Sequence, residues 1–159
     1  MERGSWYRYD FSKDSSYLIV GFGSIRMFTD VKNKGYEWDN LLKYKFPELS
    51  FNVLFVGDAN NSWWHTKYKG LSGYGPYVLA DFLNSKITEC GASKTLYVGV
   101  SMGGYGAILL GCLTHADQIM AFSPQTWLSP ERRKLQLNSK FAGYDIDENL
   151  TDLKQVLKE

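Results

Sequence analysis

The sequence has few of the residues that build metal centres and disulfide frameworks. It contains two histidines and two cysteines among 159 residues. Without paired Cys/His spacing the pattern of a zinc site is missing, so we predict neither a metal nor any other cofactor. Cys90 and Cys112 fall in segments with helical periodicity, and such isolated cysteines indicate free thiols in a reducing, cytoplasmic environment.

The sequence also lacks an excess of one charge and any long apolar run. Its 18 basic and 17 acidic residues leave a net charge of +1, which gives no electrostatic reason to expect nucleic acid or anionic lipid as a partner. No run approaches the roughly 18 apolar residues that span a membrane, and residues 1–13 lack the apolar core of a signal peptide. We therefore expect a small-molecule partner, and neither a nucleic acid nor a membrane.

The remaining composition is that of a globular protein with many aromatic side chains. Hydrophobic residues make up 44% of the chain, charged residues 22% and aromatic residues 16%. The length predicts one domain over 1–159. The aromatic excess indicates either a core rich in Tyr and Phe or a binding surface for sugars and other flat ligands.

Short apolar runs alternate along the chain with segments of helical periodicity. The predicted strands are 5–11, 17–22, 51–56, 95–100 and 118–122, and the predicted helices are 36–46, 76–88, 102–114 and a last one from about Asp147. This alternation predicts an α/β fold with three α/β/α layers around a mainly parallel sheet, with 5–11 as an edge strand. Ligands of such sheets bind at the carboxyl ends of the strands.

One serine stands among glycines at the end of the strand 95–100. Residues 98–107 read Val-Gly-Val-Ser-Met-Gly-Gly-Tyr-Gly-Ala, and the segment 99–103 matches the Gly-x-Ser-x-Gly nucleophile elbow. A strand that turns directly into a helix forces the residue between them into a strained backbone conformation, usually with positive φ. The pattern therefore predicts that Ser101 is a nucleophile. A phosphate-binding loop is the alternative, but Gly-x-Gly-x-x-Gly and a Walker lysine are absent.

Backbone N–H groups near Ser101 are predicted to form an oxyanion hole. The N–H of Met102 lies at the start of the predicted helix, where negative charge is favoured. A second donor is expected from the loop after the strand 17–22, from Phe22, Gly23 or Ser24.

Together with Ala-Phe-Ser-Pro-Gln-Thr at 121–126, this serine motif resembles the α/β-hydrolase superfamily and is similar to its small bacterial esterase-like members, some of them associated with surface polysaccharides. The resemblance covers residues 5 to 128 and implies that strand 95–100 lies between 17–22 and 118–122. It implies a serine hydrolase of acyl esters, with acylated carbohydrate as one candidate substrate. The family takes its acid and histidine from later strands, which this sequence does not show. We therefore expect a fold truncated at its C-terminal side.

Two histidines are candidates for the base that activates Ser101. His115 ends the helix that the serine begins, about 20 Å away, and is expected to cap that helix. His65 follows the strand 51–56 near Asp58, and a Ser101–His65–Asp58 triad is chemically possible because triads are defined by geometry. That strand should, however, lie two positions from the serine strand, roughly 10 Å across the sheet. The alternative for His65 is a surface residue beside two tryptophans.

The sequence offers further candidates for the acid and for the substrate pocket. Asp145 and Asp147 are further candidate acids, although helix capping explains Asp147 more simply. Trp63 and Gln125 are expected to contact the substrate.

Three hypotheses follow from the sequence. The chain is a hydrolase without its base, a complete hydrolase that uses His65 or a base from another subunit, or a non-catalytic module in which Trp63, Trp64 and Trp127 line a sugar or acyl site. If no later strand follows, 118–122 is an exposed sheet edge. We therefore expect homo-oligomerisation through that edge or its protection by 129–159.

Overall fold

The computed structural model describes residues 2–3, 6–24, 38, 50–58, 60–129 and 146–158. They form one six-stranded sheet in the order β1-β2-β4-β3-β5-β6. The strands are β1 (Glu2–Arg3), β2 (Tyr7–Asp10), β3 (Tyr17–Phe22), β4 (Asn52–Val56), β5 (Lys94–Val100) and β6 (Gln118–Phe122). The helices are α2 (Gly75–Cys90), α3 (Met102–Leu113), the 3-10 helix η1 (Glu148–Leu150) and α5 (Leu153–Val156).

The strand pairing confirms a mainly parallel α/β sheet. Strands β4, β3, β5 and β6 run parallel to one another, and β5 lies between β3 and β6 as the resemblance implied. Strands β1 and β2 are antiparallel to their neighbours. The prediction that the first strand is an edge was wrong, because β1 pairs with the outer side of β2 and the two residues of β1 were too short a signal to read.

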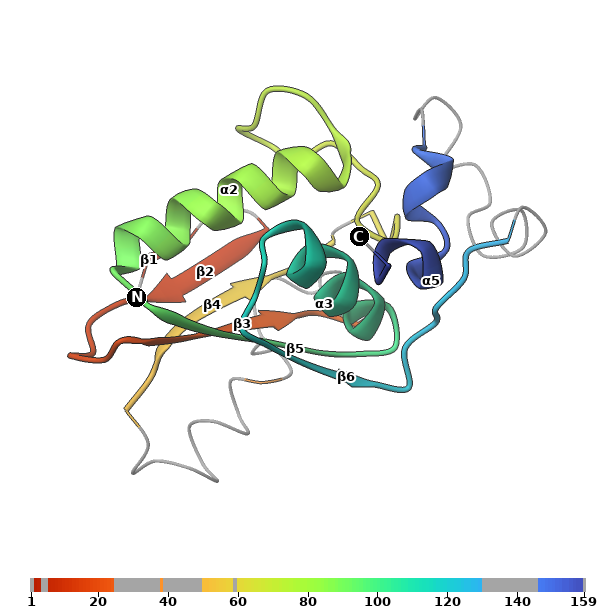
Figure 1. The fold of residues 1–159 in the computed structure, drawn as a ribbon. Coiled ribbons are helices and arrows are strands. Elements are labelled where there is room, and N and C mark those ends of the chain that lie inside the picture. The colour runs from red at the N-terminus through yellow and green to blue at the C-terminus, as the bar shows by residue number, and fades with distance from the viewer. Residues whose placement is uncertain are drawn as a thin grey trace.

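Both α2 and α3 cover the same face of the sheet (Figure 1). Alternate residues of β3, such as Leu18 and Val20, join one buried cluster with Leu79 of α2 and Leu109 of α3. On the opposite face the ring of Trp38 lies 5.9 Å from that of Phe122. The predicted helix 36–46 lies outside the described residues apart from Trp38. Among the described residues, no helix combines the length and apolar character needed to cross a membrane.

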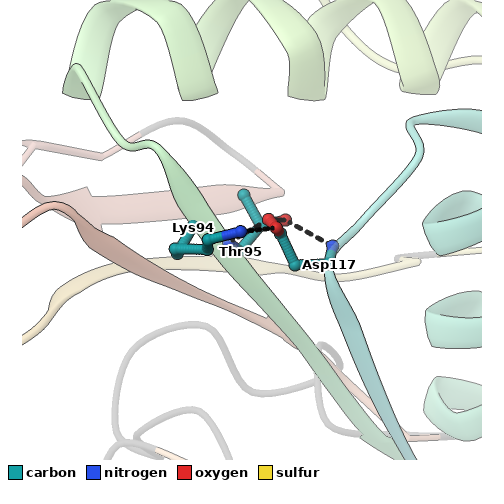
Figure 2. Close-up of polar contacts among 3 residues, drawn as sticks. All are labelled: Lys94, Thr95 and Asp117. Atoms are coloured by element: carbon teal, nitrogen blue, oxygen red, sulfur yellow. Dashed lines mark hydrogen bonds and ion pairs between the residues drawn. The ribbon is translucent and has the colours of Figure 1, made fainter.

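One carboxylate fixes the start of β6 against β5. Asp117 Oδ1 lies 2.6 Å from Lys94 Nζ, and its Oδ2 accepts a 2.9 Å bond from the Thr95 N–H. Asp117 N–H donates in return to Thr95 Oγ1 at 3.1 Å, so the three residues form a closed set of contacts (Figure 2). The hydrogen bond from Lys94 lowers the pKa of Asp117. These contacts lie at the amino ends of both strands and set their register, which continues to the serine edge.

The helix ends follow simple capping chemistry. His115 has φ 54°, and the N–H of Ala116 bonds to the carbonyl of Gly111 at 2.8 Å, so His115 ends α3 in a left-handed cap as expected. The two cysteines are free thiols, and burial raises the pKa of each.

The last predicted helix is split into η1 and α5. Asp147 caps η1 through the N–H of Asn149, and Asp152 caps α5 through the N–H of Lys154. Between them Asp152 forms an isolated antiparallel bridge with Trp127, and Leu153 N–H donates to the Thr126 carbonyl at 2.9 Å. This pairing with residues just after β6 takes the backbone out of helical geometry, which the sequence pattern did not indicate.

β6 is an edge strand within the described part of the chain, where its one partner is β5. Its sequence Gln-Ile-Met-Ala-Phe contains no charge and no proline, the residues that usually blunt an edge. Met120 and Phe122 are 51% and 49% exposed. Within the described residues β6 therefore ends the sheet, while association through this edge and its protection by 129–159 both stay predictions.

We expect the protein to form dimers through antiparallel pairing of two β6 edges. Met120→Lys would place two like charges across the two-fold axis and should shift the mass measured by light scattering from dimer to monomer. Tyr77→Lys changes an equally exposed residue on α2 and should leave the dimer intact. A wild-type protein that stays monomeric at its highest soluble concentration would rule out this pairing.

Candidate functional site

Ser101 occupies a strained turn between β5 and α3. Its φ and ψ are 55° and −117°, a conformation that costs a non-glycine residue about 1–3 kcal/mol. Its N–H donates to the carbonyl of Phe122 at 2.9 Å, and its own carbonyl accepts from the Tyr105 N–H at 3.0 Å. These two bonds to β6 and α3 hold the turn. Ser101 itself is exposed, at the carboxyl edge of the sheet.

The glycines on either side of Ser101 are required by close backbone approach. A Cβ at Gly99 would overlap the backbone of Gly103, and a Cβ at Gly103 would overlap the carbonyl oxygen of Phe22. Strand β5, helix α3 and the end of β3 therefore meet without side chains between them. The close contact between Gly103 and the end of β3 brings the loop after β3 next to Ser101.

The Met102 N–H is available as an oxyanion donor. The first hydrogen bond of α3 runs from the N–H of Tyr105 to the carbonyl of Ser101. The N–H of Met102, in the first turn, therefore has no helical acceptor, and it makes no hydrogen bond within the described residues. An unpaired N–H at a helix N-terminus stabilises a negative charge placed beside it.

Three residues, Phe22, Gly23 and Ser24, are predicted as sources of a second oxyanion N–H, and their backbone contacts differ. The Gly23 N–H donates to the Val56 carbonyl at 2.9 Å, so this expected donor is already bound to β4. Phe22 lies within the ladder, in register with Val56 and Gly99. Ser24, half-buried just after the strand, is the remaining candidate.

No base contacts the Ser101 hydroxyl within the described part of the chain. The side chain makes no capping bond at the start of α3. His115 caps the C-terminus of α3, at the opposite end of the helix from Ser101.

His65 is buried and faces the first turn of α3. Its Nε2 lies 3.1 Å from Tyr105 Oη, and Tyr105 donates its hydroxyl proton to the Leu150 carbonyl at 2.6 Å. The tyrosine has one proton to give, so Nε2–H of His65 is the donor in their bond. The exposed fraction of His65 is 2%, so the expectation of a surface residue was wrong.

Asp58 organises the loop after β4. Its buried carboxylate accepts from the N–H groups of Asn60, Ser62 and Trp64 at 3.1, 2.5 and 3.0 Å, and from the Ser62 hydroxyl at 3.0 Å. Burial raises the pKa of Asp58, and the donated hydrogen bonds oppose that rise. The structure therefore does not assemble the predicted Ser101–His65–Asp58 triad: Asp58 binds its own loop, and His65 binds Tyr105.

The tryptophans also differ from the prediction. Trp63 is buried in the main core cluster, with its ring 5.7 Å from that of Tyr105, so it packs in the core and does not line a surface pocket. Trp127 is exposed and Gln125 is half-buried beyond β6. Trp64, buried beside Trp63, contacts Met102 and Phe22. The sequence signal for that contact was the small Gly106 on the facing turn of α3.

A surface pocket of about 360 Å³ opens beside the loop of Asp58. It is lined by His65, Tyr74, Gly75, Pro76, Tyr77 and Asp147, and Ser101 is not among these residues. Asp147 also caps η1, as capping chemistry suggested, and Asp145 lies outside the described residues. The part of the chain that the structure describes contains no group of three or more His, Cys, Asp or Glu side chains placed to hold a metal.

The fold is shared with several solved structures at low sequence identity. The capsule O-acetyltransferase of Neisseria meningitidis serogroup A matches with a TM-score of 0.61 and 22% identity over 96% of this chain and 63% of that one. The glycosylation-associated protein (Gap123) complex of Streptococcus agalactiae matches at 0.53 and 17%, over 96% of this chain and 29% of that one. The α/β hydrolase MGS-MChE2, from a metagenome of lagoon sediments at Mar Chica, Morocco, matches at 0.51 and 15%, over 99% and 65%.

These comparisons establish an α/β-hydrolase-like fold. The chain spans less than two thirds of the length of each of these structures. No family model and no curated protein matches the sequence.

We expect Asp58→Asn to destabilise the protein although the two side chains have nearly the same shape. The amide would turn an N–H₂ group toward backbone N–H groups that now donate to Oδ1 and Oδ2, so at least one buried donor loses its acceptor. The free energy of unfolding in urea should fall by about 1–3 kcal/mol.

Asp147→Asn is the matched control, since asparagine caps a helix about as well as aspartate. It should change the urea midpoint little. Equal stability of Asp58→Asn and the wild type would show that the carboxylate does not organise its loop.

Proposed function

We propose that this protein is an acyl-transfer enzyme of the serine hydrolase type, with Ser101 as the nucleophile. The observation that supports this proposal most strongly is the strained, exposed serine at φ 55° on the N-terminus of α3. A backbone this costly persists where the surrounding structure enforces it, and such positions cluster at active sites.

In the proposed reaction the Ser101 oxygen attacks the carbonyl carbon of an acyl ester, and a base takes its proton. The carbonyl oxygen becomes an oxyanion, which the Met102 N–H and the N–H of Ser24 would stabilise. Collapse of the intermediate breaks the ester C–O bond, and the leaving alcohol takes a proton. Water then releases the acid from the acyl-enzyme, or a sugar hydroxyl accepts the acyl group.

The proposed substrate is an acyl ester of a carbohydrate. The name of the capsule O-acetyltransferase, a structure with this fold, agrees with that chemistry. The fold alone does not select a substrate, so this part of the proposal rests on Ser101 and on the O-acetyl transfer that the name of that structure states.

The base is the open element of this proposal. His65 would have to give up its bond to Tyr105 before it could turn toward the serine. We therefore infer a base from a residue outside the described contacts of Ser101, in this chain or in another subunit. A binding module for carbohydrate or acyl ligands is the second candidate, favoured because no base contacts the Ser101 hydroxyl among the residues that the structure describes.

A fluorophosphonate probe separates the two candidates. We expect the wild-type protein to form one covalent adduct on the peptide that contains Ser101, detected by mass spectrometry, and Ser101→Ala to form none. Ser123→Ala changes a second exposed serine with positive φ and should label normally. A wild-type protein that stays unlabelled would favour the binding module.

Replacement of His65 tests its role separately. We expect His65→Gln to keep most of the labelling rate of Ser101, because the Nε2–H of His65 is already donated to Tyr105. His115→Gln serves as the control at the other histidine. A general base usually contributes roughly a hundredfold or more to the rate. If the labelling rate of Ser101 falls by that factor in His65→Gln but not in His115→Gln, His65 is the base, as the sequence predicted.

A further inference from the structure

Trp64 touches both sides of the proposed oxyanion hole. Its indole Nε1 donates to the carbonyl oxygen of Met102 at 2.9 Å, and its ring meets that of Phe22 edge to face, with centroids 5.2 Å apart and planes at 88°. Met102 supplies one proposed oxyanion N–H, and Phe22 ends the strand that leads to Ser24. The indole is fully buried, so it supports these groups from behind and does not contact substrate.

Helix α3 leaves space for this indole. A Cβ at Gly106 would overlap the indole ring of Trp64. Any larger residue there would push the ring away from Met102, which lies four residues earlier on the same face of the helix. The glycine costs helix stability relative to alanine, and close contact with Trp64 explains its presence.

The backbone of Trp64 is held as firmly as its side chain. Asn61, Trp63 and Trp64 have φ values of 50°, 56° and 72°, so three non-glycine residues of one loop lie in the left-handed region. The Trp64 N–H bonds to Asp58 at 3.0 Å. The buried carboxylate thus keeps the loop in a conformation that the chain would otherwise avoid, and this conformation directs the indole at α3.

We propose that Trp64 is a positioning residue: by binding the Met102 carbonyl oxygen, it fixes the backbone that directly follows the Met102 N–H relative to the end of β3, with Asp58 holding Trp64 in turn. This inference rests on the proposed function, because it assumes that charge develops beside Ser101. Oxyanion donors must lie about 2.7–3.1 Å from the position that the oxyanion will occupy, and a misplacement of about 1 Å can cost a hundredfold in rate. Loss of the indole N–H frees Met102 to shift by such amounts.

The test compares Trp64→Phe with Trp63→Phe. Both tryptophans are buried neighbours on one loop, but Trp63 packs on Tyr105. We measure the second-order rate constant for phosphonylation of Ser101. Trp64→Phe should lower it by roughly tenfold to a hundredfold, and Trp63→Phe by much less. Equal rates for the two variants would overturn the positioning role while leaving the proposed function intact.

A second measurement separates positioning from general loosening of the fold. In the Ser101→Cys protein, alkylation by iodoacetamide needs no oxyanion hole, whereas acylation by p-nitrophenyl acetate does. Adding Trp64→Phe should slow acylation at position 101 and leave alkylation there unchanged, both followed by peptide mass spectrometry. Equal slowing of the two reactions would identify a purely structural role.

If Trp64→Phe does not fold, 3-benzothienylalanine at position 64 keeps the bicyclic ring and replaces the N–H by sulfur. The same drop in phosphonylation is expected, and an unchanged rate would overturn the role of the indole N–H. If neither the wild type nor Ser101→Cys reacts at position 101, the proposed function fails, and the positioning role fails with it.

Discussion

The structure depends on the direct change from strand to helix at Ser101. Strand β5 is paired on both sides, and α3 begins one residue after it, so the chain must reverse within a single residue. The resulting positive φ cannot relax, because the Ser101 N–H is bound to β6 and its carbonyl to the first turn of α3. Only glycines at 99 and 103 allow the backbones to approach this closely. The exposed hydroxyl is a consequence of these contacts.

The loop after β4 forms a second layer behind this turn. A carboxylate out of contact with water is costly, and Asp58 offsets that cost with hydrogen bonds from three N–H groups and a hydroxyl. The same bonds hold the left-handed residues of the loop and place Trp64 against α3. Asp58 and Trp64 thus support the backbone at the start of α3, 38 residues after Trp64 in the sequence. The indole that makes this contact lies in the buried core.

The sequence alone predicted the sheet, the positions of α2 and α3 and the strained serine, because these follow from local apolar periodicity and from one short motif. It failed where distant segments meet. β2 is not an edge strand because the two residues of β1 pair with it. The last helix is divided because Asp152 forms a bridge with Trp127. His65 and Asp58 are close in sequence, and the sequence predicts them as a possible catalytic pair. In the structure His65 binds Tyr105 and Asp58 binds Ser62. Side-chain partners of this kind are set by tertiary packing, which periodicity does not encode.

The most direct test of this account is a crystal structure of the protein after reaction with a phosphonate ester. We predict a covalent bond from the Ser101 oxygen to phosphorus and a phosphoryl oxygen about 2.7–3.1 Å from the backbone nitrogen of Met102, with the φ of residue 101 still positive. A phosphoryl oxygen turned to solvent, or a serine with negative φ and its hydroxyl inside the fold, would contradict the central claim that the backbone turn builds the reactive site.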